Sequence, residues 1–181
     1  MKKIFVVVAC LMALAVGATA QQQINFSDLP LIATPAPIPA GYADLNWSNF
    51  WYVDPSQYGA GGPGYQNPFT HRDVAFVGGQ FCGPVQPGCY GVITSLGGAL
   101  RFFPSSAVMA AGYHTNQVTV LAYNQGTFVG SATYRLTTAP RIVGFPSSWG
   151  AVTEMQIQTD TAGDLVLFDL IVYPVVQDPP R

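Results

Sequence analysis

The chain has 181 residues, of which 49% are hydrophobic and only 9% are charged. Seven Lys and Arg residues against nine Asp and Glu give a formal net charge of −2, which becomes −4 if Lys2 and Lys3 are removed by processing. This balance argues against nucleic acid or an anionic membrane surface as a partner. The length suffices for one domain with a sizeable core.

The N-terminal residues are typical of a secretory signal peptide, residues 1–20. After the two lysines, an apolar run extends over 4–16, and the small residues 18–20 form a cleavage box. We expect the mature protein to be secreted and extracellular. The longest later apolar run, 165–176, is interrupted by Asp169, so it predicts no membrane span.

Two cysteines follow the signal peptide, Cys82 and Cys89, separated by a spacer rich in proline and glycine. An even cysteine count in a secreted chain favours a disulfide that closes a small loop. The alternative is a metal site, but the paired ligand spacing usual for such sites is missing. We therefore predict a Cys82–Cys89 disulfide.

Taken in chain order, the pattern predicts about nine short strands and no helix. Residues 24–29 alternate as a first strand, a lead-in with four prolines follows, and an aromatic stretch occupies 41–69. The later strands are predicted at 73–77, 90–94, 99–103, 118–123, 127–136, 141–145, 152–159 and 165–173. The prediction is an all-β, antiparallel two-sheet β-sandwich of jelly-roll type.

The strands belong to one domain. Residues 21–40 supply its first strand and lead-in, 41–176 the remainder, and 177–181 a short tail. Period two is clearest in 152–159. Its two faces are Thr153, Met155 and Ile157 on one side and Glu154, Gln156 and Gln158 on the other. We expect the second of these faces to be solvated.

Several segments resemble a known family. They are Asn25–Leu29 (NFSDL), Leu45–Phe50 (LNWSNF), Asp73–Phe76 (DVAF), Val118–Tyr123 (VTVLAY) and Phe168–Val172 (FDLIV). In this order they are similar to secreted galactose-binding-like jelly-roll proteins, which occur as fungal extracellular proteins and, with a sorting tail, as bacterial surface proteins of PEP-CTERM-like type. This chain lacks the sorting tail.

The resemblance implies a jelly roll whose first and last strands lie together, often with a structural Ca²⁺ nearby. Asp28 and Asp169 match the positions of the acidic groups in those strands, although the family commonly has two adjacent acids where this chain has only Asp169. Ca²⁺ binds six to eight oxygens, many of them backbone carbonyls. The alternative is that Asp28 is a turn residue and Asp169 an acid at a strand edge.

The aromatic stretch suggests a function. Flat rings held in loops and short extended segments can stack on the apolar faces of sugars. The rings proposed to bind carbohydrate are Trp47, Trp51, Tyr52, Tyr58 and Tyr65. The first hypothesis is a non-catalytic, lectin-like domain that binds a cell-wall or matrix polysaccharide. The rival interpretation places Trp47, Phe50 and Trp51 in the core.

A second hypothesis is a polysaccharide lyase or hydrolase on the same scaffold. Tyr113 and His114 would transfer protons, and Arg101 would neutralise a uronate carboxylate. The third is a structural extracellular protein. Asn25 and Asn46 begin glycosylation sequons that apply if the source is eukaryotic.

Overall fold

The computed structural model of the chain describes residues 20–59, 61–66, 73–78, 89–96, 101–160 and 164–175. The predicted signal peptide up to residue 19, Cys82 and the tail 177–181 lie outside the described residues. Cys89 is buried at the beginning of a strand, and its disulfide with Cys82 stays a prediction. In the part of the chain that is described, no helix has the length and apolar character needed to span a membrane.

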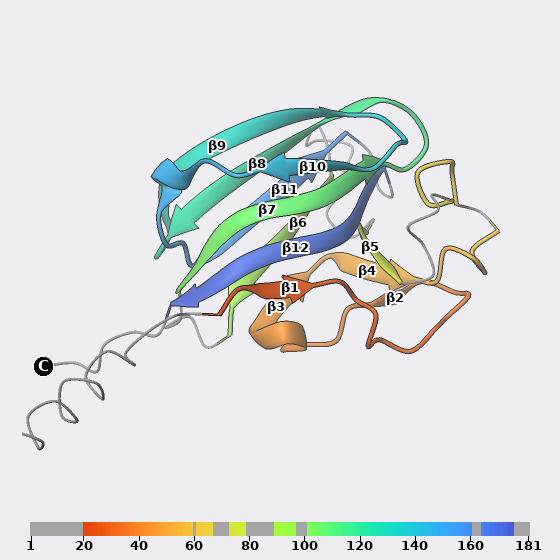
Figure 1. Cartoon of the computed structure of the whole chain (residues 1–181), viewed down its shortest axis with the longest axis horizontal. Coiled ribbons are helices and arrows are strands. Elements are labelled where there is room, and N and C mark those ends of the chain that lie inside the picture. Colours follow the sequence, from red (N-terminus) through yellow and green to blue (C-terminus); the bar gives the residue numbers. More distant parts are fainter. Residues whose placement is uncertain are drawn as a thin grey trace, which may run out of the picture.

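The described residues form a β-sandwich of two antiparallel sheets (Figure 1). The seven-stranded sheet has the order β10-β7-β12-β5-β4-β2, and β1 also pairs with β12. The five-stranded sheet has the order β3-β6-β11-β8-β9. The predicted all-β fold is confirmed, with twelve strands in the described residues rather than about nine.

The strands of the seven-stranded sheet are β1 (Gln22–Ile24), β2 (Ala36–Pro37), β4 (Phe50–Val53), β5 (Val74–Val77), β7 (Arg101–Ala111), β10 (Arg141–Gly144) and β12 (Leu165–Val175). Those of the five-stranded sheet are β3 (Leu45–Ser48), β6 (Cys89–Ser95), β8 (Asn116–Asn124), β9 (Thr127–Leu136) and β11 (Glu154–Thr159). Two 3₁₀ turns complete the fold, η1 (Tyr42–Asp44) and η2 (Ser147–Trp149).

The differences from the prediction have local causes. Strands β2, β3 and β4 lie in the proline-rich and aromatic segments. They have only two to four residues each, which is too short for an alternating pattern to be recognised between the turn residues. Strand β7 was predicted to end at Phe103, but it continues through Pro104 to Ala111. Pro104 lies opposite Val172, where the register of β7 against β12 shifts. A proline is tolerated in a strand at such an irregularity.

The first and last strands lie side by side, as the resemblance implied (Figure 1). In β1, Gln22 pairs with Val172 and Ile24 with Leu170. Strand β12 also lies between β7 and β5, so it is central in its sheet. Its inward side chains Leu165, Leu167 and Leu170 are fully buried in the main core between the sheets. The C-terminal strand is therefore an integral part of the core.

The chain passes from the five-stranded to the seven-stranded sheet at Asn49, between β3 and β4. Asn49 has a φ of 58°, a left-handed conformation that asparagine adopts more readily than most residues. Its Nδ2 donates to the carbonyl of Gly78 at 2.9 Å and to that of Tyr90 at 2.7 Å. One buried amide thus joins the end of β5 to β6 across the sandwich.

Candidate functional site

Three of the five rings predicted to bind carbohydrate are buried. Trp47 is 7% exposed, Tyr52 6% and Tyr65 1%. Trp47 packs edge-on against Phe50 at 5.5 Å between ring centroids. A ring buried this deeply offers no face for a sugar to stack on, so we correct the prediction for these three residues. Trp47 and Tyr52 pack in the main core between the sheets, and Tyr65 packs in a second apolar cluster.

The other two rings, Trp51 and Tyr58, are half-buried on the outer face of the seven-stranded sheet. They pack against a second apolar cluster that includes Phe76 and Phe168. Trp51 lies directly over Gly78, where an added Cβ would come within 2.3 Å of the indole. Both rings therefore contribute to packing, and only part of each faces solvent.

The outer face of the five-stranded sheet has a different character, and we call it the open face. In β6, β8 and β11, buried residues alternate strictly with half-buried or exposed ones over most of their length. The buried set packs in the main core, and the other set points away from it. Glu154, Gln156 and Gln158 belong to the outward set, as the alternation in the sequence predicted.

The strand register arranges the open face in three rows across the sheet. The first row is Asn46, Thr94, Glu154, Tyr123 and Phe128. The second is Ser48, Val92, Gln156, Leu121 and Ser131. The third is Tyr90, Gln158, Thr119 and Thr133. From strand and residue spacings, the rows cover about 19 Å by 13 Å.

The side chains of the open face are mainly neutral hydrogen-bonding groups and aromatic rings. Tyr123 and Phe128 contact each other edge-on at a centroid distance of 5.7 Å, and Phe128 is 54% exposed. The hydroxyls of Thr119 and Thr133 are 3.0 Å apart. Gln156 Nε2 donates to Glu154 Oε1 at 2.9 Å, which orients the carboxylate within the face. Glu154 is the one charged side chain in the three rows.

A polar pocket of about 380 Å³ continues the open face beyond its third row. Gln117 and Arg135, which are paired in the β8–β9 ladder, form part of its wall. The other lining residues are Thr115, Asn116 and Asp160. Asn116 Nδ2 donates to the carbonyl of Asp164 at 3.0 Å, while its Oδ1 is buried with no hydrogen-bond partner in the described structure. The pocket thus presents both donors and acceptors.

The two acids predicted to hold Ca²⁺ have other partners. Asp28 is exposed, and its Oδ1 accepts a hydrogen bond from the Tyr42 hydroxyl at 2.5 Å. Burial, and then this carboxylate, raises the pKa of Tyr42 well above its usual range. Asp169 Oδ1 accepts from Gln23 Nε2 at 3.2 Å. The described residues contain no group of three or more His, Cys, Asp or Glu arranged to hold a metal, and the Ca²⁺ site stays a prediction.

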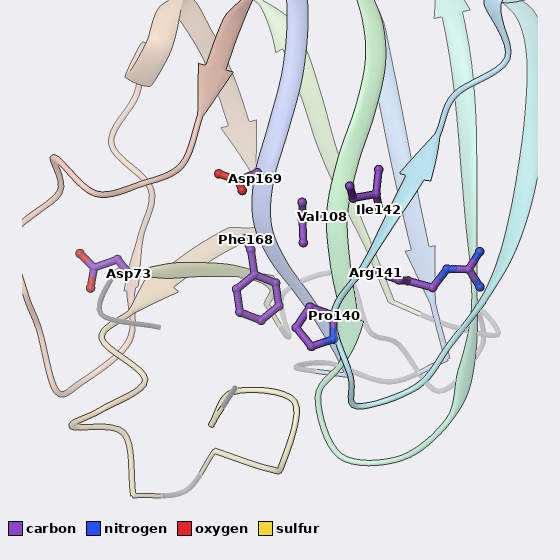
Figure 2. A pocket seen from close by; sticks show the side chains of 7 residues that line it. All are labelled: Asp73, Val108, Pro140, Arg141, Ile142, Phe168 and Asp169. Carbon is purple, nitrogen blue, oxygen red and sulfur yellow. The ribbon is translucent and has the colours of Figure 1, made fainter. Parts of the chain in front are cut away.

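A second concavity, of about 390 Å³, lies on the outer face of the seven-stranded sheet (Figure 2). Its apolar lining residues are Val108, Pro140, Ile142 and Phe168, and its charged ones are Asp73, Arg141 and Asp169. Val108 pairs with Ile142 on one side and with Asp169 on the other, so neighbouring strands bring these groups together. We call this site the acidic pocket.

The residues of the lyase hypothesis do not form one site. Arg101 begins β7, whereas Tyr113 and His114 follow its last residue, Ala111. An eleven-residue strand is about 35 Å long. Arg101 therefore cannot reach a sugar held by Tyr113 and His114, and this version of the hypothesis is wrong. His114 Nε2 instead lies 3.5 Å from the buried carboxylate of Asp164.

Comparisons with known proteins leave the function open. No protein-family model matches the sequence, and no curated protein matches it. Among solved structures, a GH26-CBM35 β-(1,4)-mannanase of Podospora anserina has a TM-score of 0.38 and 13% identity, over 90% of this chain and 29% of that one. The CBM22-1–GH10 modules of a Clostridium thermocellum endo-1,4-β-D-xylanase, complexed with xylohexaose, have a TM-score of 0.38 and 11% identity. That match covers 88% of this chain and 28% of the other. The chain thus spans less than a third of either protein, and at this similarity neither activity transfers to it.

Most of the open face was missed by the sequence reasoning. A usable signal was present, because 89–95 and 116–123 show the same alternation as 152–159. In those segments Tyr90 and Tyr123 occupy outward positions. The density of aromatic residues favoured 41–69 instead, where Trp47, Tyr52 and Tyr65 are buried. Alternation identifies an outward ring, whereas local aromatic density does not.

Proposed function

We propose that the protein is a secreted, non-catalytic carbohydrate-binding domain whose open face binds a neutral polysaccharide. The observation that carries the proposal is the three-row arrangement of amide, hydroxyl and aromatic side chains on one solvated sheet face. Amides and hydroxyls can hydrogen-bond to sugar hydroxyls, and rings can stack on the apolar faces of pyranoses. This assignment moves the binding surface away from the rings first proposed.

The shape and charge of the face favour an extended neutral chain. From the strand geometry, the Cα atoms of Tyr90 and Tyr123 are about 16 Å apart on a diagonal across β11, with Gln156 between them. Two rings at that spacing can contact separate units of one oligosaccharide. With Glu154 as the one charge in the rows, a strongly anionic polymer such as a polyuronate has no counter-charge there.

The test is affinity electrophoresis in gels that contain soluble β-glucan, mannan or xylan, together with depletion by insoluble cellulose and chitin. We expect retardation or depletion by at least one neutral polysaccharide, and weaker binding by Tyr123→Ala. Loss of one stacking contact is worth about 1 kcal/mol, or about a fivefold change in Kd.

The matched control is Phe103→Ala, because Phe103 is also an exposed aromatic residue, 43% accessible, but lies in β7 of the other sheet. It should bind like the wild type. If no neutral polysaccharide retards the folded protein, or if Phe103→Ala weakens binding as much as Tyr123→Ala does, the open face is not the binding surface.

A further inference from the structure

The acidic pocket contains a carboxylate that has neither a hydrogen-bond donor nor a cation as a partner in the described structure. Asp73 is 1% exposed, and neither of its side-chain oxygens has a hydrogen-bond partner. Among the described residues, no cation lies within ion-pair distance of it either. Buried polar groups are nearly always paired, and a buried charge is costly unless a partner compensates it. Such a group is a candidate for pairing with a ligand.

The neighbouring charges increase the negative potential at this site. Asp54 is also buried, but its carboxylate accepts hydrogen bonds from Ser56 N, Ser56 Oγ and Gln57 Nε2 at 2.9, 2.7 and 2.6 Å. Although burial alone would raise the pKa of Asp54, these hydrogen bonds hold it below its usual value. Burial, followed by repulsion from Asp54, raises the pKa of Asp73 to about 6. Asp54 is thus compensated internally, and Asp73 is not.

The cation in the pocket lining does not neutralise Asp73. Arg141 Nη1 donates to the backbone carbonyl of Arg135 at 3.3 Å. In Figure 2, its guanidinium extends away from Phe168, whereas Asp73 lies on the opposite side of that ring and Asp169 lies above it. Neither carboxylate of the pocket therefore forms an ion pair among the residues described.

We propose that the acidic pocket binds an amino sugar through its ammonium group, which the negative potential of Asp73 and Asp169 attracts. The pocket, at about 390 Å³, is in the size range of small-ligand sites and is large enough for one ring. Phe168 and Pro140 supply an apolar surface for the C–H face of the ring. The cationic character of the ligand follows from the pocket alone, whereas the choice of a sugar rests on the proposed function.

The test is methyl NMR of the whole mature protein titrated with glucosamine, glucose, N-acetylglucosamine, cyclohexylamine and Ca²⁺ in separate experiments. Glucosamine should shift the methyl resonances of Val108 and Ile142, which line the pocket, and leave that of Leu121 on the open face unchanged. Glucose and N-acetylglucosamine have no cationic nitrogen and should not shift them. The readout is separate from the open face, so failure here and failure of the proposed function are distinguishable.

The variant Asp73→Asn keeps the shape of the side chain and removes its charge, and should weaken glucosamine binding at least tenfold. The matched control is Asp44→Asn, which changes an exposed acid at the end of η1 and should bind like the wild type. The proposal is overturned if glucosamine shifts neither methyl group, or if Asp73→Asn binds it unchanged. Equal affinity for cyclohexylamine would refute the sugar, and a shift produced by Ca²⁺ alone at lower concentration would replace the amino sugar with a metal.

Discussion

At the scale of single residues, Asp73 shows how a buried charge can oppose folding. Its folded-state pKa of about 6 lies above the usual value for an aspartate, so the folded protein retains a proton that the unfolded chain has lost. The free energy of unfolding therefore falls as the pH rises from about 4 through 6. Asp54 repels the Asp73 charge and so acts in the same direction. Of the charged residues that line the pocket with Asp73, Asp169 is an acid and Arg141 donates to a backbone carbonyl, so neither reverses this sign.

We predict that Asp73→Asn raises the free energy of unfolding by about 1–2 kcal/mol at pH 7, since the amide needs no counter-charge although it is left without hydrogen-bond partners. At about pH 3 the gain should vanish, because the carboxyl is protonated in both states. Urea unfolding of the two proteins at both pH values measures the difference. A variant that is less stable than the wild type at pH 7 would show that the Asp73 charge has a stabilising partner.

Asn49 combines a strained backbone with two hydrogen bonds that join the sheets. Asn49→Ala should lower the free energy of unfolding by about 2–4 kcal/mol. It removes both hydrogen bonds, and alanine adopts a positive φ less readily than asparagine does. Asn49→Gly loses the same bonds but tolerates the backbone conformation, so it should be about 1 kcal/mol more stable than the alanine variant. Chemical denaturation compares the two, and equal losses would mean that the backbone conformation contributes nothing.

At the scale of elements, β12 connects most of the seven-stranded sheet. It pairs with β1, β5 and β7, and each fully buried aliphatic side chain that it contributes is worth about 1.5–3 kcal/mol. Leu165, Leu167 and Leu170 together therefore approach the whole stability of a domain, about 5–15 kcal/mol.

We predict that a chain ending at Gly163 does not fold, whereas one ending at Val176, after the last residue of β12, melts like the full-length mature protein. Circular dichroism and a thermal melt of both truncations provide the measurement. A cooperative melt for the shorter chain would show that β12 is dispensable, contrary to its central place in the sheet.

At the scale of the whole molecule, the two proposed binding surfaces face opposite directions, one on each sheet of the sandwich. One is nearly uncharged and the other is anionic, so they should respond differently to salt. At about 1 M ionic strength, where the Debye length is about 3 Å, binding of a neutral polysaccharide should be unchanged and glucosamine binding should be clearly weaker. Isothermal titration at low and high salt tests this. Equal salt sensitivity of both ligands would argue for one shared site.

The sequence determined the class of fold and the direction of many side chains, because both follow from local alternation. The segment 127–136 is a strand with the bounds that its pattern predicted, and Glu154, Gln156 and Gln158 face outward as period two requires. The resemblance to jelly-roll proteins correctly implied that the first and last strands pair. These features depend on each residue's own chemistry and on the pleat of the strand.

Only the tertiary structure decided which aromatic rings are exposed and which acids share a pocket. Trp47 and Tyr65 lie in segments where turns obscure the period, and their burial depends on the sheets that pack against them. Asp73 and Asp169 are far apart in the chain, and they line one pocket because β5 pairs with β12. Such pairings arise from the order of strands in the sheet. Local pattern cannot specify that order, because each strand could bury its apolar face against several partners.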